Sequence, residues 1–157
     1  EKQLTQFRQK HIGFVFQSYN LLPTLTALEN VTLPLIFKGI PRSLRNKKAK
    51  EALKSVGLEG RLNHKPSEMS GGQQQRTSIA RAFVGNPEII FADEPTGNLD
   101  TKTTTEIMDL ITSIARDNNQ TLVIVTHDME ISTCADRIMY MRDGNIEKIE
   151  SVQKQLC

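Results

Sequence analysis

The sequence has 157 residues, of which 38% are apolar and 24% are charged, and a chain of this size and composition can bury one hydrophobic core. Twenty Lys and Arg residues against 18 Asp and Glu residues leave a net charge of +2, which gives no reason to expect a nucleic-acid partner. The longest apolar stretch, residues 21–37, is interrupted by two prolines and by Glu29 and Asn30, so we expect no direct membrane insertion.

The first predicted strand lies near the N-terminus. Residues 1–10 are mostly polar and are expected to form an exposed lead-in. The apolar run from Ile12 to Phe16 then predicts a strand that ends at Gln17. Judged from its neighbours alone, Gln17 is an ordinary polar residue at a strand end.

A capping box predicts the first helix of the next region. Thr26 and Glu29 have the required spacing, so the helix should begin near Thr26, and Pro34 should end or kink it. We expect the apolar side chains of residues 21–37 to be mostly core and partly a groove for a helix of another chain. The predicted inner face of the helix carries Leu28, Val31 and Leu35.

A basic helix is predicted over residues 41–56 and is closed by Gly57. Its lysines are expected to face water rather than a lipid surface. His64, in the loop that follows, is predicted to be a surface residue. Cys134 and Cys157 have no metal-ligand spacing, so we expect both to be reduced thiols.

Ser70, Gly71 and Gly72 precede a segment whose apolar residues recur at helical spacing, from Gln73 to Val84. A helix that begins there directs unpaired N–H groups and the positive end of its dipole outward, and the glycines let an anion approach the backbone. Ser70 can cap the helix and also donate its hydroxyl to a phosphate oxygen. A serine cap without any ligand is the simpler interpretation if this motif is taken alone.

Two acids follow the second predicted strand, a short apolar run from Glu88 to Ala92 that has the pattern of a strand buried on both faces. The carboxyl end of such a strand is where an open α/β sheet presents ligands. Successive strand residues point in opposite directions, so we assign Asp93 to a magnesium ion and Glu94 to the attacking water. A pair of solvated acids is the alternative.

An amphipathic helix over residues 101–116 leads to a second buried strand, residues 122–125. His127 follows that strand, so we expect it at the same sheet edge as the two acids, where it can contact a terminal phosphate. A β-hairpin is predicted around the Asp143–Gly144 turn, and the last residues are predicted to be disordered.

These motifs together resemble a known family. SGGQ at residues 70–73, IIFADE at 89–94, GNLD at 97–100 and a histidine after TLVIVT at 121–126 resemble the signature, Walker B, D-loop and H-loop of ABC transporter nucleotide-binding subunits. With IGFVFQSYNLLPTLTALENV upstream, ADEPTGNLD looks most like the branch that serves lipoprotein-releasing, macrolide-exporting and antimicrobial-peptide-exporting systems.

The resemblance implies an α/β fold, the C-terminal part of an ABC-type P-loop ATPase core with a mostly parallel sheet, flanking helices and an inserted helical subdomain. Residues 1–17 and 85–157 would form a partial RecA-like core, and residues 18–84 the subdomain with the signature. It also implies ATP and Mg²⁺ as cofactors, a transmembrane permease and a second nucleotide-binding subunit as partners, and a cytoplasmic position on the inner face of the cell membrane.

The resemblance also implies roles for individual residues. Gln17 would begin the Q-loop and reach the magnesium, and Asp100 would link two sites across a dimer interface. Glu94 and His127 would be catalytic, and Asp93 would bind metal. The signature residues would contact the nucleotide held by the opposite protomer, and these are Ser70, Gly71, Gly72 and Gln73.

One family motif does not occur in this sequence. G-x-x-x-x-G-K-[ST], the loop that cradles phosphates, lies upstream of Gln17 in the family, so we expect the chain to be the C-terminal portion of a longer subunit that is inactive alone. The alternative is a non-catalytic module that supplies its signature in trans. DNA-repair and chromosome-structure ATPases share these motifs, but the short helical insert argues against that class.

Overall fold

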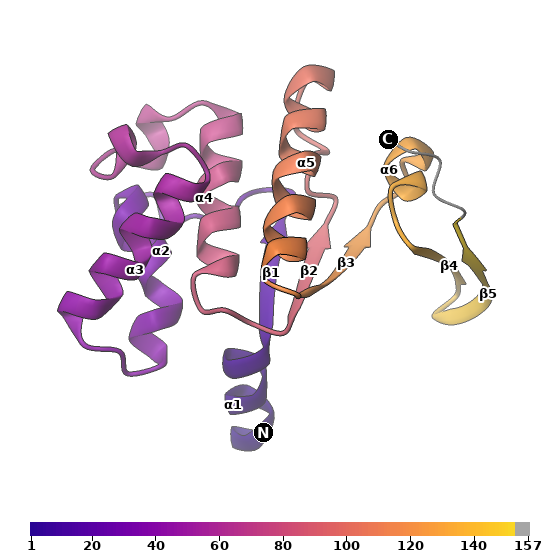
Figure 1. Cartoon of the computed structure of the whole chain (residues 1–157), viewed down its shortest axis with the longest axis horizontal. Helices are drawn as coiled ribbons and strands as arrows, with labels where there is room; N and C mark the ends of the chain where they lie inside the picture. Colours follow the sequence, from indigo (N-terminus) through magenta and orange to yellow (C-terminus); the bar gives the residue numbers. More distant parts are fainter. Residues whose placement is uncertain (153–157) are drawn as a thin grey trace. The chain divides into compact units, whose positions relative to one another are not determined.

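The computed structural model describes residues 1–152 and divides them into a first unit, residues 1–125, and a second unit that begins at Thr126. Figure 1 shows the elements along the chain. The first unit contains α1 (Lys2–His11), β1 (Ile12–Phe16), α2 (Ala27–Phe37), α3 (Arg42–Ser55), two 3₁₀ turns (Glu59–Arg61 and Pro66–Glu68), α4 (Gly71–Phe83), β2 (Ile89–Asp93), α5 (Thr101–Asp117) and β3 (Thr121–Val125).

The first unit is built on a parallel sheet with the order β1-β2-β3. The register pairs Phe16 with Asp93 and Asp93 with Val125, so the three strands end level at their carboxyl ends. The predicted α/β class with a parallel sheet and flanking helices is confirmed. Because the strands end level, the residues after β1 and after β2 leave the sheet at one edge.

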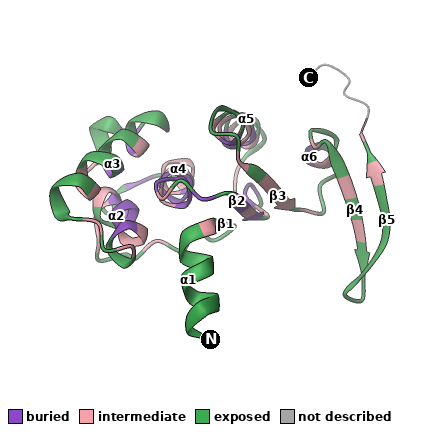
Figure 2. Ribbon diagram, turned by 60° about the horizontal axis from the view of Figure 1, so that its bottom comes forward, coloured by how far each residue is buried: buried purple, intermediate pink, exposed green. Residues whose placement is uncertain are grey.

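Three helices, α2, α3 and α4, pack against one another, and α4 also packs against β1. Figure 2 shows buried residues concentrated along α4 and on the inner sides of α2 and α3, whereas α1 is exposed for nearly all its length. Complete burial of a Leu or Ile side chain contributes about 1.5–3 kcal/mol to folding. Fully buried aliphatic side chains of this core include Val31, Leu35, Leu53, Ile79 and Ile90.

Local capping determines where two of these helices begin. The Thr26 hydroxyl accepts a hydrogen bond from the Glu29 amide, and the Glu29 carboxylate accepts one from the Thr26 amide at 2.8 Å, which confirms the predicted capping box. Gly57 closes α3 with a φ of +74°, a conformation that glycine adopts without the steric cost of a Cβ atom. Both helix boundaries therefore follow from a few adjacent residues.

Local structure differs from or adds to the sequence expectations in three places. Residues 2–11 are exposed, as expected, and they form a helix that the sequence analysis did not predict. Pro34 does not end the second helix, which continues for three more residues to Phe37. Full burial of Leu35 in that last turn offsets the hydrogen bond lost at the proline. His64 is half-buried rather than a surface residue, and its ring lies 2.9 Å from the Arg61 guanidinium.

The sheet is less buried than its apolar sequence predicts. In β2, Ile90 and Ala92 are fully buried, but Phe91 on the opposite face is only half-buried. β3 was expected to be buried and is half-buried, and 57% of Val125 is exposed. Within residues 1–152, β3 pairs only with β2, so it is an edge strand of this sheet.

The second unit contains α6 (Met129–Thr133), β4 (Arg137–Arg142) and β5 (Asn145–Ser151). The two strands form an antiparallel hairpin, and its turn places Asp143 and Gly144 at positive φ, which confirms the predicted hairpin. The predicted disorder of the last residues falls on 153–157, outside the described residues. Within residues 1–152, no helix combines the length and hydrophobicity that crossing a bilayer requires.

Candidate functional site

The two predicted acids lie where β2 ends, but they do not continue one strand. Asp93 is the last residue of β2 and is exposed, whereas Glu94 has left the strand with a φ of +42°. The Glu94 amide donates to the Val125 carbonyl at 2.9 Å, which fixes the first peptide of the turn. Because Glu94 lies outside the strand, the alternating side-chain directions of β2 do not determine where Glu94 points, contrary to the prediction. A left-handed backbone at a residue other than glycine is strained, and such residues cluster at functional sites.

Gln17 follows β1 and is held against the loop that follows β2. Its carbonyl accepts a hydrogen bond from the Asn98 side chain at 3.0 Å. Its side chain lies so close to Gly97 that a Cβ atom there would come 2.5 Å from the Gln17 amide nitrogen. Gln17 and the Asp93–Asn98 loop therefore belong to one cluster at the carboxyl edge of the sheet. The reach of Gln17 to a magnesium ion, which the resemblance implies, stays a prediction.

Ser70 and Gln73 cap the start of α4 reciprocally. The Ser70 hydroxyl oxygen accepts from the Gln73 amide at 3.3 Å, and the Gln73 side chain accepts from the Ser70 amide at 3.1 Å. This confirms Ser70 as the N-cap. Because the hydroxyl acts as an acceptor in the cap, its own hydrogen is still available for a donor bond to an anion.

Gly71 and Gly72 lie in the first turn of α4, where neighbouring side chains approach closely. A Cβ atom at Gly71 would come 2.9 Å from the Tyr19 hydroxyl, and one at Gly72 would come 3.0 Å from the Thr103 methyl group. The two glycines therefore have a packing reason in addition to the predicted anion contact. A hollow of about 380 Å³ opens beside this turn and is lined by Ser70, Gly71, Gly72, Gln73, Arg76, Asn98, Leu99, Asp100, Thr103 and Glu106.

Asp100 caps α5 with both carboxylate oxygens. One oxygen accepts from the Thr103 amide at 3.0 Å, and the other accepts from the Thr103 hydroxyl at 2.7 Å. These hydrogen bonds hold the pKa of Asp100 below its ordinary value, with the bond from the backbone amide as the largest cause. The Asp100 carboxylate therefore stays charged beside the hollow, and its role across a dimer interface stays a prediction.

His127 belongs to the second unit, two residues after β3 ends, and is exposed. Its neighbour Asp128 caps α6 by accepting a hydrogen bond from the Glu130 amide at 2.8 Å. The Asp128 amide in turn donates to the Thr126 hydroxyl at 3.0 Å. The segment around His127 is thus ordered by its own polar side chains, and the assignment of His127 to a terminal phosphate stays a prediction.

The residues at the sheet edge have the donor chemistry that magnesium requires. Among residues 1–152, no group of three or more His, Cys, Asp or Glu side chains has the geometry of a metal cluster. Mg²⁺ needs less, because it usually takes one or two carboxylates and fills its other positions with water and substrate phosphates. The exposed Asp93 carboxylate and the Gln17 side chain, held against Gly97, are oxygen donors that fit such a site.

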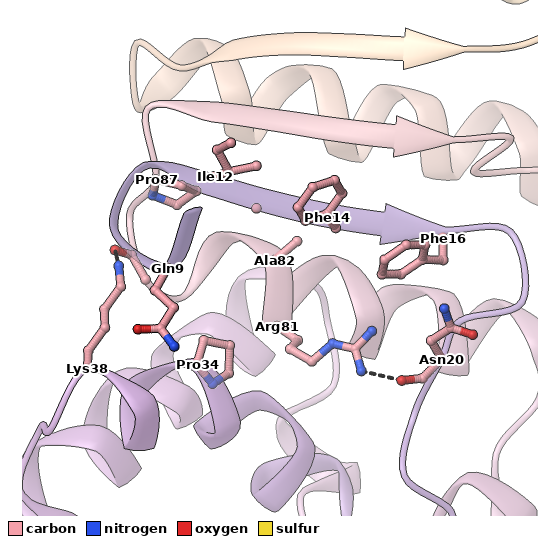
Figure 3. A pocket seen from close by; sticks show the side chains of 12 residues that line it. Gln9, Ile12, Phe14, Phe16, Asn20, Pro34, Lys38, Arg81, Ala82 and Pro87 are labelled. Atoms are coloured by element: carbon pink, nitrogen blue, oxygen red, sulfur yellow. Dashed lines mark hydrogen bonds between the residues drawn. The ribbon is translucent and has the colours of Figure 1, made fainter. Parts of the chain in front are cut away.

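A second hollow, of about 250 Å³, lies between β1, α2 and α4 (Figure 3). Figure 3 shows Arg81 reaching from α4 toward the loop after β1, where it donates to the carbonyls of Tyr19, at 2.8 Å, and Asn20. Burial lowers the pKa of the Arg81 guanidinium. In the nearby apolar segment Val31 and Leu35 belong to the core, as predicted, while Leu22, Ile36 and Phe37 are exposed.

Sequence reasoning missed two residues that join these elements. Gln75 is fully buried in α4, and Arg81 holds the loop that follows Gln17. The signal for Gln75 was its spacing, because it lies four residues before Ile79 on the inner face of the helix. A polar residue on a buried stripe needs hydrogen-bond partners, and those partners lie far away in the sequence.

A family model and several known proteins match this chain, and their descriptions agree with one another. A family model described as ABC transporter matches residues 1–97. An ABC transporter ATP-binding protein of Thermotoga maritima is 55% identical over 150 residues, which are 96% of this chain and 64% of that protein. The macrolide export ATP-binding/permease protein MacB of Rhodopirellula baltica is 51% identical over 144 residues, which are 90% of this chain and 21% of that protein.

A solved structure is similar over almost the whole chain. The dimeric ATP-binding cassette MJ0796 of Methanocaldococcus jannaschii, bound to ADP and Pi, matches with a TM-score of 0.85 and 48% identity. The match covers 98% of this chain and 68% of that one. The chain thus spans about two thirds of the length of this structure and of the Thermotoga relative.

Proposed function

This chain belongs to the ABC transporter family, and from that premise we propose that it is the part of a transporter subunit that binds and hydrolyses ATP. The observation that carries the proposal is the level ending of β1 and β2, paired at Phe16 and Asp93. It brings Gln17, Asp93 and the Glu94 turn to one edge of the sheet, where α/β folds bind nucleotides.

The start of α4 binds the triphosphate. Ser70 donates its hydroxyl hydrogen to a phosphate oxygen while its oxygen keeps the cap, and the amides of Gly71 and Gly72 lie at the positive end of the helix dipole. Gln73 holds the Ser70 backbone through the reciprocal bond. The hollow beside this turn is where the nucleotide of a second copy enters, and Asp100 lines it.

The strand ends supply the hydrolytic groups. Asp93 and Gln17 hold Mg²⁺, which when bound neutralises charge on the phosphates. Glu94 orients and polarises the attacking water, and its turn is fixed by the bond to the Val125 carbonyl. His127 contacts the terminal phosphate and holds the water in place.

The proposed partners are a second copy of the subunit and a transmembrane permease. The dimeric cassette bound to ADP and Pi supports the homodimer, and the relative named as a macrolide export ATP-binding/permease protein supports the permease. We place the subunit in the cytoplasm on the inner face of the membrane. There it powers export, or extraction of lipid or peptide, and the exposed apolar residues Leu22, Ile36 and Phe37 are its surface for the permease.

Replacing Glu94 by Gln in the full-length product of the gene tests the chemistry. We expect turnover of ATP to fall about 100-fold or more, because the water loses its general base, while ATP-dependent dimerisation is retained. Glu88→Gln is the matched control, since Glu88 immediately precedes the opposite end of β2 and lies 2.8 Å from His11. Wild-type turnover in the Glu94 variant, or an equal loss in the Glu88 variant, refutes the assignment.

The same turnover assay on residues 1–157 alone addresses the alternative role. In the alternative role the chain only supplies the start of α4 to the nucleotide site of another subunit. Such a chain hydrolyses no ATP by itself. It restores ATP hydrolysis when it is mixed with a partner whose own signature serine is replaced. The alternative is rejected if mixing the chain with that partner restores nothing.

A further inference from the structure

A buried glutamine on α4 joins the two turns that carry the proposed hydrolytic residues. Gln75 is fully buried, and its side-chain amide donates to the Phe16 carbonyl at 3.3 Å and to the Pro95 carbonyl. Phe16 immediately precedes Gln17, and Pro95 immediately follows Glu94. One side-chain amide therefore connects α4 to the backbone beside both of these residues.

The Phe16 and Pro95 carbonyls belong to two turns whose backbone is also held by other hydrogen bonds. The Phe16 carbonyl also accepts from the Tyr19 amide at 3.2 Å, and the Gly97 amide closes the second turn by donating to the Glu94 carbonyl at 3.1 Å. Glu94 itself has a φ of +42°, so its conformation depends on the bonds on either side of it. The bond from Gln75 to Pro95 lies directly on the C-terminal side of this strained residue.

The side-chain oxygen of Gln75 differs from its amide nitrogen in hydrogen bonding. Within residues 1–152, its side-chain oxygen is buried and has no hydrogen-bond partner. A buried oxygen without a partner lowers stability, which offsets part of what the two donor bonds contribute. The Gln75 side chain therefore matters more for the position of the two turns than for the stability of the fold.

We propose that Gln75 is a positioning residue, which fixes the turns of Gln17 and Glu94 relative to the start of α4. The proposal rests on the proposed function, because it assigns those turns to ATP hydrolysis. A displacement of α4 moves the amide of Gln75, and both turns move with it. The helix that touches one nucleotide is thereby coupled to the residues that act on another.

The chain offers a closely matched control in Gln120. Its side-chain amide also donates to a proline carbonyl, that of Pro87 at 2.6 Å, and its side-chain oxygen is also buried without a partner among the described residues. Pro87 lies before β2, at the end of the strand opposite to Glu94. Leucine at either position removes a side-chain bond to a proline carbonyl, and at Gln120, which is half-buried, it also removes a 3.5 Å bond to the Asn86 side chain. Only at Gln75 are the lost contacts next to the proposed site.

The test compares Gln75→Leu with Gln120→Leu in the full-length gene product. We expect both variants to lose similar thermal stability, whereas only Gln75→Leu lowers kcat for ATP, by about 10- to 100-fold, with KM changed less than about threefold. Wild-type kcat in Gln75→Leu, or an equal loss in Gln120→Leu, overturns the proposal. If Gln75→Leu does not fold, Gln75→Met, which keeps the length of the side chain, replaces it.

Amide hydrogen exchange separates this proposal from the proposed function. Exchange at Tyr19 and Gly97 should rise at least about tenfold in Gln75→Leu and stay unchanged in Gln120→Leu, because these amides close the two turns. Unchanged exchange at both amides in Gln75→Leu overturns the positioning role. If the wild-type protein hydrolyses no ATP, the proposed function fails, and the exchange result still decides the role of Gln75.

Discussion

Ser70 has two roles that different substitutions can separate. Its oxygen caps α4, and its hydrogen is proposed to bind a phosphate. Replacing a capping Ser by Ala costs about 1 kcal/mol, within a range of about 0.5–2 kcal/mol. In a protein of 150–250 residues this lowers Tm by roughly 2–4 °C per kcal/mol. Ser70→Ala should therefore lose both about 1 kcal/mol of stability and the phosphate contact.

Ser70→Asp should lose only the second role. Aspartate is as good an N-cap as serine, and its charge interacts favourably with the helix dipole, so stability should stay within about 0.5 kcal/mol of the wild type. The same carboxylate repels a phosphate and has no hydrogen to donate. We therefore expect Ser70→Asp to fold normally and to have little or no ATP turnover in the full-length protein.

Thr26→Ala provides the control for the cap itself. Thr26 and Glu29 form the same reciprocal box at the start of α2, outside the hollow beside α4. Its loss should cost about as much stability as Ser70→Ala, with turnover per folded molecule unchanged. Thermal denaturation and steady-state ATP hydrolysis are the assays. Full turnover in Ser70→Asp, or destabilisation as large as that of Ser70→Ala, would refute this account of Ser70.

Three further predictions concern single contacts. Gly97→Ala should displace the Gln17 side chain, because the new Cβ atom would lie 2.5 Å from its nitrogen, and should lower kcat with a stability change of about 1 kcal/mol or less, measured by turnover and denaturation. Hydrogen bonds from Thr26, first from its backbone amide, lower the pKa of Glu29 from its ordinary value of 4.5. Glu29 therefore stabilises the folded chain above the pKa of the unfolded chain and loses this contribution as the pH falls through its lowered pKa, so Glu29→Gln should flatten the acid side of a stability–pH curve. Leu53→Ala should cost about 2–5 kcal/mol in urea unfolding, because Leu53 is fully buried between helices, and a cost below about 1 kcal/mol would contradict the packing described.

Features that depend on neighbouring residues were predictable from the sequence. The sequence correctly identified two N-capping residues, Thr26 and Ser70, and the glycine that closes α3, Gly57. Each of these residues acts within one helical turn. The strand from Ile12 to Phe16 and the Asp143–Gly144 hairpin turn were predicted for the same reason. Backbone hydrogen bonding and turn geometry at these places are set by side chains a few positions away.

Features that depend on distant packing were predicted less well. The helix continues past Pro34, where the full burial of Leu35 offsets the lost hydrogen bond. The apolar pattern placed Leu35 on the inner face, but how completely other helices bury it does not follow from the sequence of this helix alone. β3 reads as a buried strand, but burial depends on what pairs with it and covers it. Glu94 leaves the strand with a positive φ although its amide still donates to the Val125 carbonyl, and the residues adjacent to Glu94 do not reveal this turn.

The sequence predicted individual residues of the candidate site but not the hydrogen bonds that connect their turns to α4. The Asp93–Glu94 pair was placed at the carboxyl edge of the sheet from the rule that parallel strands present ligands there, whereas the role of Gln17 came only from the family resemblance. Gln75 was not identified, because its partners Phe16 and Pro95 are separated from it by long stretches of sequence. A polar residue on the buried face of a helix is the pattern that could have indicated it.

The most direct measurement of the central claim is a structure of the full-length gene product with Mg²⁺ and a non-hydrolysable ATP analogue. We predict two protomers in which the Ser70 hydroxyl of one lies about 3 Å from a terminal phosphate oxygen of the analogue held by its partner. We also predict that Asp93 and Glu94 of the partner face the same phosphate. If the Ser70 hydroxyl contacts only water and the cap of its own helix, the claim that this end of α4 binds nucleotide is contradicted.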